Sequence, residues 1–170
     1  TLAAALQSAL LQTVENLPIP KVMAYQLADG TTTVSFVRPA HALMALHADQ
    51  VLDVSILGLR AGRITHGHRF LGVRNIEVAA ADAYPEALAA RGKVMADFSE
   101  RRAEIERQLR ERSNTLGASL GPQDAVDALL EEVTALVEYP TVLVGEFEPV
   151  FLSVPQECLV LTMRTNQKYF

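Results

Sequence analysis

The sequence contains a single cysteine, Cys158, no tryptophan, and only 9 glycines and 8 prolines among its 170 residues. One cysteine cannot form an internal disulfide, which points to a reducing compartment. The low glycine and proline content, together with 49% hydrophobic residues, excludes a collagen-like fibre, a low-complexity linker and a disordered tail. We therefore expect a globular fold of about one domain, with or without a helical appendage.

Long apolar segments are also missing. Residues 1–14 carry no charge, but they include polar side chains and are shorter than the ~20 apolar residues that a bilayer requires. A basic start and a small-residue cleavage site, which would mark a signal peptide, are not evident. We expect a cytoplasmic protein that contacts no membrane. Because the chain begins with threonine and ends without a polar tail, we also expect it to be a piece of a longer protein.

The charge is acidic overall but unevenly distributed. The net charge of −5 is unusual for a free-standing nucleic-acid-binding protein, which would ordinarily be basic. Residues 60–112 nevertheless carry a net charge of +3, against −8 for the rest of the chain. Any contact with a polyanion is therefore expected to come from a local patch in this middle block.

The most basic part of that block is the segment Arg60–Arg74. It contains four arginines, two histidines, three glycines and no acidic residue. Guanidinium groups suit phosphate oxygens because they present a planar fork of donors, and glycines allow backbone N–H groups to approach a ligand closely. The alternative is that these arginines pair with carboxylates elsewhere in the fold, and the sequence leaves both interpretations open.

Hydrophobic periodicity and turn residues predict the elements of the first half of the chain. Apolar residues every fourth position predict a helix that ends at Leu17-Pro18, because proline cannot continue it. The further expected elements are a hairpin of strands 23–28 and 31–37 around Asp29-Gly30, a short helix from Arg38-Pro39 to about His47, a strand at Gln50–Leu59, a long loop or irregular hairpin over 60–74, and a short strand at Ile76–Ala79.

The second half is predicted to be mainly helical. The expected elements are a helix from Asp82, as its cap, to Gly92, a helix over 93–112, a loop over 114–121, a helix from Pro122 to Tyr139-Pro140, strands at 141–145 and 150–154, and a last helix over 155–164. This mixed order predicts an α+β fold, in which a mixed or antiparallel sheet packs with several helices. We predict an N-terminal helix or linker over residues 1–20 and an α+β domain over 21–170.

The helix around residues 100–112 alternates acidic and basic side chains at spacings of three and four. That pattern is typical of a solvated, ion-paired helix face, although the same arginines could contact an RNA backbone.

No catalytic or metal-binding motif is recognisable. The histidines and Cys158 lack the spacing of a zinc site, and no nucleotide-binding loop or nucleophile elbow is present. Cys158 stands among apolar residues, which favours a small buried side chain over a nucleophile. Glu131 and Glu132 point about 100° apart on a helix and cannot readily share one site. The residues themselves therefore predict no catalytic centre and no metal.

Several strings, taken together in their order and spacing, resemble one family. They are Leu17-Pro18-Ile19-Pro20-Lys21, Phe36-Val37-Arg38-Pro39 followed by His41, Gly67-His68-Arg69-Phe70, Arg91-Gly92-Lys93-Val94, Leu129-Leu130-Glu131-Glu132-Val133, Leu136-Val137-Glu138-Tyr139-Pro140, and Thr162-Met163 with Gln167-Lys168-Tyr169-Phe170. The series is similar to the N-terminal half of the beta subunit of the bacterial two-subunit glycine–tRNA ligase (glycyl-tRNA synthetase). One departure is Met23-Ala24-Tyr25, where the family commonly has Met-Arg-Trp.

The resemblance implies a role in an AMP-forming aminoacyl-tRNA synthetase. In that family the alpha subunit activates glycine with ATP and Mg²⁺, so no cofactor is expected in this segment. The beta subunit binds glycine tRNA and joins the alpha subunit in a heterotetramer; no DNA partner is implied. HD-type and anticodon-binding domains belong to other parts of the beta subunit. The present segment resembles the editing-type domain of the phenylalanine enzyme's beta subunit, near the tRNA acceptor arm.

The implied role is non-catalytic support of tRNA charging, through acceptor-arm contact and through assembly of domains and subunits. Two alternatives stay open: a hydrolytic editing module, and a purely structural scaffold for the alpha subunit and the HD-type domain. The polar members of the shared motifs and the basic segment supply the RNA-binding candidates, since Arg and Lys could neutralise phosphates and His could donate to a base or a 2′-OH. They are Arg38, His41, Arg60, Arg63, His68, Arg69 and Lys168. For Arg38, which precedes Pro39, bonding to nearby carbonyl groups is the structural alternative.

Overall fold

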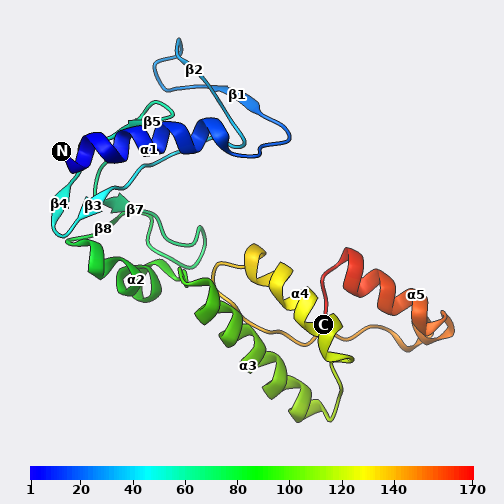
Figure 1. The fold of residues 1–170 in the computed structure, drawn as a ribbon. Coiled ribbons are helices and arrows are strands. Elements are labelled where there is room, and N and C mark those ends of the chain that lie inside the picture. Colours follow the sequence, from blue (N-terminus) through cyan, green and yellow to red (C-terminus); the bar gives the residue numbers. More distant parts are fainter. The chain divides into compact units, whose positions relative to one another are not determined.

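The computed structural model describes residues 1–170, which form two compact units, Thr1–Gly92 and Lys93–Phe170. All the strands, paired in small two-stranded antiparallel sheets, lie between α1 and the helical turn η1, and only helical elements follow, so the fold mixes α and β structure as the sequence predicts (Figure 1). The chain passes from one unit to the other between residues 92 and 93. The N-terminal helix, predicted as a separate helix or linker over residues 1–20, contacts strand β5 and belongs to the first unit.

Helix α1, Leu2–Asn16, opens the first unit and confirms the predicted helix. The Thr1 hydroxyl caps it by accepting from the Ala4 N–H. On its side, the Gln7 amide donates to the Ser55 carbonyl and accepts from the Ser55 N–H, both at 2.8 Å. These paired bonds tie α1 to strand β5, Ser55–Ile56.

Strands β1, Met23–Gln26, and β2, Thr33–Phe36, form the predicted hairpin, with Met23 opposite Phe36. The Asp29 carboxylate organises its turn by accepting from the N–H groups of Thr31 and Thr32 at 2.9 and 2.8 Å and from the Thr32 hydroxyl at 2.5 Å. These donors, the Thr32 hydroxyl first, lower the pKa of Asp29 to about 2.

Residues 38–60 differ from the prediction. Instead of a helix up to His47 and one strand over 50–59, the chain forms two tight hairpins. Strands β3, Leu46–His47, and β4, Gln50–Val51, turn at Ala48, while β5 and β6, Leu59–Arg60, turn at Leu57-Gly58. The backbone φ is positive at Ala48, Leu57 and Gly58, as such turns require. Alanine and leucine rarely adopt this conformation, which is why these turns are hard to recognise from the residues alone.

The expected helix before His47 is absent because its backbone groups pair elsewhere. Met44 forms an isolated parallel bridge with Gly62, and the Ala45 N–H donates to the Gly62 carbonyl at 3.3 Å. These pairings hold residues 44–47 in extended conformation.

Strands β7, Ile64–Thr65, and β8, Ile76–Glu77, enclose a long loop, which confirms both the irregular hairpin and the short strand after it. Three short helical turns follow: η1, Ala81–Ala83, α2, Tyr84–Ala87, and η2, Leu88–Gly92. Asp82 does not cap them, because it lies within the first turn, which begins after Ala80 and has no side-chain cap. The buried apolar side chains of this unit are Val54, Ile76, Val78 and Leu88.

The second unit is built on two packed helices, α3, Phe98–Leu116, and α4, Gln123–Leu136 (Figure 1). Asp97 caps α3 by accepting from the Glu100 N–H at 2.8 Å, and Gly117, with φ of 61°, ends it. Helix α3 therefore begins five residues after the predicted start, since the Met95 N–H is bonded to the Glu138 carbonyl. At its other end, the helix includes the first part of the predicted 114–121 loop. The buried core of the second unit contains Ile105, Leu109, Val126, Leu129 and Leu130.

The prediction of strands at 141–145 and 150–154 is wrong. Residues 141–148 have no regular structure, and a 3-10 turn, η3 at Pro149–Ser153, follows. Their β-branched composition suggested strands, but these residues find no pairing strand and many of their apolar side chains are exposed. The last predicted helix is present as α5, Gln156–Leu161, extended by η4, Thr162–Asn166.

Cys158 on α5 is exposed, so the prediction of a buried cysteine is also wrong. The short helix α5 has no buried residue, and of its side chains only Leu159 is partly covered, so the apolar neighbours of Cys158 do not bury it. None of the helices combines the length and apolar character needed to cross a membrane.

Candidate nucleic-acid interface

The loop between β7 and β8, residues 66–75, is closed by its own backbone. The Gly67 N–H donates to the Val73 carbonyl at 3.0 Å, and the Gly72 N–H donates to the His68 carbonyl at 2.9 Å. The His66 ring nitrogen Nδ1 also contacts the Arg74 carbonyl across the loop. The segment is therefore an ordered turn structure rather than an open chain.

The same loop is anchored to the end of η2. The His68 N–H donates to the Gly92 carbonyl at 2.7 Å, and the Val73 N–H donates to the Arg91 carbonyl at 3.0 Å. Glycine is required at this contact because a Cβ on Gly67 would lie 2.6 Å from the Gly92 oxygen, and a Cβ on Gly72 would lie 2.7 Å from the Gly92 carbonyl carbon. The three glycines thus allow two backbone segments to touch.

The His68 side chain shapes the tip of the loop. Its Nδ1 accepts from the N–H groups of Phe70 and Leu71, each at 3.2 Å. With Nδ1 acting as acceptor, the neutral ring carries its proton on Nε2. His68, predicted as a direct RNA ligand, therefore holds two backbone amides, while its Nε2 takes no part in these bonds.

The loop presents charged and apolar side chains to solvent. The Phe70 side chain is 85% exposed and Leu71 is 59% exposed. The predicted candidate Arg69 is exposed beside them. Arg74, later in the loop, and Arg91, on η2, are exposed as well. None of the three guanidinium groups has a hydrogen-bond or ion-pair partner. An ordered loop thus carries unpaired positive charge beside an exposed aromatic ring.

Arg60 and Arg63 are engaged within the first unit. Arg60 pairs with Asp53 at 3.1 Å, although its side chain is 78% exposed. Arg63 donates to the carbonyl groups of Asp49 at 2.9 Å and Ala79 at 3.1 Å. Of the basic segment, Arg60 thus pairs with a carboxylate, Arg63 bonds backbone carbonyl groups, and Arg69 has no hydrogen-bond or ion-pair partner within the protein.

Arg38 and His41 follow β2 and are exposed, and neither side chain makes a hydrogen bond. Arg38 therefore does not donate to neighbouring carbonyl groups. Nearby, the Tyr25 hydroxyl accepts from the Ala40 N–H at 3.2 Å. Lys168 lies in the second unit, where its Nζ pairs with Glu132 Oε1 at 2.7 Å.

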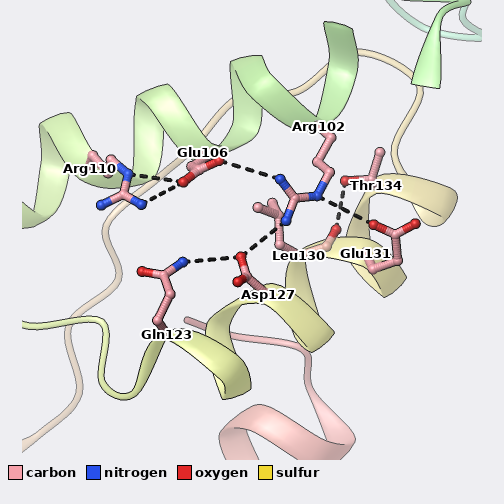
Figure 2. Close-up of polar contacts among 8 residues, drawn as sticks. All are labelled: Arg102, Glu106, Arg110, Gln123, Asp127, Leu130, Glu131 and Thr134. Carbon is pink, nitrogen blue, oxygen red and sulfur yellow. Dashed lines mark hydrogen bonds and ion pairs between the residues drawn. The ribbon is translucent and has the colours of Figure 1, made fainter. Parts of the chain in front are cut away.

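The charged face of α3 is occupied by ion pairs, as the sequence predicts. Figure 2 shows Arg102 reaching three carboxylates: Glu106 at 3.5 Å on its own helix, and Asp127 at 3.1 Å and Glu131 at 3.3 Å on α4. Glu106 also accepts from the Arg110 Nε at 3.1 Å. The network joins α3 to α4 and leaves little unpaired charge on this face.

The remaining arginines of α3 behave similarly. Arg107 pairs with Glu104 at 2.7 Å and Glu111 at 3.0 Å, and its hydrogen bond lowers the pKa of Glu104 to about 2. Arg101 donates to the Thr134 carbonyl at 3.0 Å and lies over the Phe98 ring. Only Arg112 on this helix is exposed without a partner.

A cavity of about 350 Å³ in the first unit lies between α1, residues 43–46 and the turns at Ala81 and Tyr84. Its lining is aliphatic apart from the Tyr84 ring. Nowhere in the structure do three His, Cys, Asp or Glu side chains gather as potential metal ligands.

The sequence did not single out Phe70, Arg74 and Arg91 as candidate binding residues, although all three are exposed. Arg74 was recognised as part of the basic segment but was not singled out, and Arg91 is separated from it by 16 residues of chain. A charged-apolar-charged string, Arg69-Phe70-Leu71-Gly72-Val73-Arg74, was the available signal.

Comparison with known proteins gives one consistent result. Residues 1–170 match the family model described as glycyl-tRNA synthetase beta subunit. Relatives named glycine–tRNA ligase beta subunit include that of Leptothrix cholodnii, 61% identical over 100% of this chain, and that of Janthinobacterium sp., 58% identical over 97%. The chain spans about a quarter of the length of these curated relatives, 24% in each.

Proposed function

The chain belongs to the glycyl-tRNA synthetase beta subunit family, and on that premise we propose that it supports attachment of glycine to its tRNA by contacting the tRNA. The whole enzyme would comprise this beta subunit and an alpha subunit that activates glycine with ATP and Mg²⁺ in the cytoplasm. The segment itself would bind and position RNA near the acceptor arm, without carrying out the ligase chemistry.

The observation that supports this proposal most strongly is the unpaired positive charge of the 66–75 loop. Between Asp53 and Glu77 the sequence has no acidic residue, in a chain that is acidic overall. Arg69 and Arg74 are exposed on the loop, and Arg91 belongs to the turn on which the loop is anchored. Unpaired guanidinium groups are suited to phosphate oxygens because no carboxylate has to be displaced.

The contacts also rank the remaining candidates. Arg38 and His41 are exposed and unbonded, so they are available to RNA. Arg63 and Lys168 are already bonded to carbonyl or carboxylate groups, and we expect them to contribute less. Arg60 is intermediate, because its ion pair with Asp53 is largely exposed to solvent and therefore weak.

The test uses the full-length beta subunit with its alpha subunit. Binding of glycine tRNA would be measured at several salt concentrations for the wild type and for an Arg69→Gln, Arg74→Gln double variant. The variant should bind more weakly and lower the slope of log K against log [salt] by about 1 for each lost phosphate contact. Arg112→Gln, which removes an exposed unpaired arginine from α3, is the matched control. Unchanged affinity and slope in the double variant would overturn the proposal.

Assembly is a second role, favoured by a run of exposed apolar side chains in the second unit. The run is Leu143, Val144, Phe147, Val150, Phe151, Leu152, Val154, Val160 and Leu161. Exposed apolar surface of this extent usually marks a protein contact. We propose that the alpha subunit covers it in the enzyme.

Leu152→Ser and Leu161→Ser together should then weaken the alpha–beta association, as measured by analytical ultracentrifugation. Leu11→Ser, at another exposed leucine, on α1, should leave it unchanged. If association is intact but the beta subunit unfolds at a lower temperature, the run instead packs against other parts of the beta subunit.

The expected likeness to the editing-type domain of the phenylalanine enzyme's beta subunit belongs to the same proposal. A hydrolytic role would require this segment to accelerate deacylation of a mischarged glycine tRNA. Measurable deacylation that depends on residues of this chain would favour editing over non-catalytic support.

A further inference from the structure

Phe70 is the most exposed of the large hydrophobic side chains in the chain, at 85%. Its backbone is nevertheless fixed, because its N–H donates to the His68 ring. Hydrogen bonds within the loop or to the Arg91 carbonyl also hold the N–H groups of Gly67, Leu71, Gly72 and Val73. An aromatic ring held in water by an ordered backbone forgoes the free energy of burial. That arrangement is typical of a contact surface rather than of a flexible loop tip.

The surroundings of Phe70 favour RNA over protein as the partner. Arg69 precedes the ring, Arg74 closes the loop, and both guanidinium groups are without carboxylate partners. No acidic side chain occurs within the loop. Aromatic rings flanked by cations are the usual means of binding unpaired nucleotides, because each base offers a face for stacking and each phosphate a negative charge.

We propose that Phe70 stacks on an unpaired base of the bound tRNA, while Arg69 and Arg74 contact the adjoining phosphates. This inference rests on the proposed tRNA contact and adds the nucleotide-binding element to it. In it, His68 is a positioning residue: its Nδ1 holds the Phe70 and Leu71 amides and so fixes where the ring stands.

The test compares three substitutions of Phe70 in the full-length enzyme, with glycine tRNA as the probe. Phe70→Ala and Phe70→Leu should each weaken binding by about 5- to 150-fold, the range for loss of one stacked base. Phe70→Trp should bind within about threefold of the wild type, because it retains a stacking face. Phe70→Ala should leave the salt slope unchanged, since no charge is removed.

Leu11→Ala is the control. Leu11 is also an exposed large apolar side chain, but it stands on α1, a helix with Glu15 and no basic residue, and it lies outside the run proposed to bind the alpha subunit. Its loss should not change tRNA affinity. Thermal unfolding of each Phe70 variant should match the wild type, since an exposed ring contributes little to folding.

Three outcomes would overturn the proposal. Wild-type affinity in Phe70→Ala would exclude a stacked base, even if the arginine variant confirms tRNA binding. Wild-type affinity in Phe70→Leu alone would indicate a general apolar contact. Loss of alpha-subunit binding with tRNA affinity intact would identify the loop as a protein interface. If instead the Arg69→Gln, Arg74→Gln double variant bound tRNA with wild-type affinity and salt slope, the proposed function itself would be overturned.

Discussion

Gly72 and Gly92 lie in direct backbone contact, so that a Cβ on Gly72 would stand 2.7 Å from the carbonyl carbon of Gly92. The two residues are separated by 20 positions in sequence, and their contact anchors the 66–75 loop to the end of η2. Because the atoms on the far side are backbone rather than a flexible side chain, the contact has little room to adjust. The position of the proposed RNA-binding loop therefore depends on this pair.

Gly72→Ala should destabilise the first unit by about 1–3 kcal/mol, the usual range for an overpacked site. The added methyl would push the loop from Gly92 and weaken the His68–Gly92 and Val73–Arg91 backbone bonds. Thermal unfolding followed by circular dichroism measures the loss. Gly62→Ala is the control, since its Cβ would meet nothing within 4 Å and its φ is not positive; its stability should change by less than about 0.5 kcal/mol. Equal effects of the two substitutions would contradict the packing argument.

Arg102→Met should weaken the α3–α4 pair by about 1–2 kcal/mol. The substitution leaves the carboxylates of Glu106, Asp127 and Glu131 without their common cation. Removing the central cation of a network reduces stability more than breaking one exposed ion pair does. The loss should shrink at high salt, because screening already weakens these attractions and the repulsions left behind. Urea unfolding at low and high ionic strength measures both effects.

Arg102→Lys should restore only part of that stability, since an ammonium is a point charge and cannot reach three carboxylates in a fork. Arg112→Met, on the same helix and without a partner, should be close to neutral. A loss in Arg112→Met as large as that in Arg102→Met would show that general helix charge matters, rather than the network.

The Glu104–Arg107 pair should make stability depend on pH in the acid range. The Arg107 hydrogen bond lowers the pKa of Glu104 from 4.5 to about 2, so the folded state favours the carboxylate. Its contribution is complete above pH 4.5 and is lost as the pH falls through the interval from 4.5 to about 2. Glu104→Gln should therefore reduce the fall in unfolding temperature over that interval.

Because the pair is near the surface, the difference is expected to be small and sensitive to salt. Arg107→Gln should flatten the profile in the same way, since it removes the group that lowers the pKa. If Glu104→Gln follows the wild-type pH profile throughout, the pair does not contribute to stability.

Local signals in the sequence predicted α1, α3, α4, α5 and the first hairpin, although not the absence of a helix before His47. Pro18 and Gly92 end their helical segments where expected, and Asp29-Gly30 forms the turn of the β1–β2 hairpin. The two hairpins over 46–60 were missed because Ala48 and Leu57 adopt positive φ without being glycine or asparagine. Only tertiary pairing, such as the Met44–Gly62 bridge, selects that conformation.

The basic segment could be predicted from composition, but the role of each arginine could not. Arg63 and Arg69 are equivalent in sequence terms, six residues apart in one glycine-rich stretch. In the fold, the carbonyl groups of Asp49 and Ala79 come together beside Arg63 and bind it, while the Arg69 side chain has no hydrogen-bond or ion-pair partner. Such convergence of distant backbone groups has no signature along the chain.

This difference yields a last prediction that separates structure from binding. Arg63→Met should destabilise the first unit by about 1–2 kcal/mol, because two carbonyl groups lose a charged donor. Arg69→Met should leave the unfolding temperature unchanged and weaken tRNA binding, because its guanidinium has no partner within the protein. Measuring both quantities on both variants assigns the roles. If Arg69→Met destabilises the fold as much as Arg63→Met does, then Arg69 is structural as well, and the unpaired charge on which the RNA contact depends is not available.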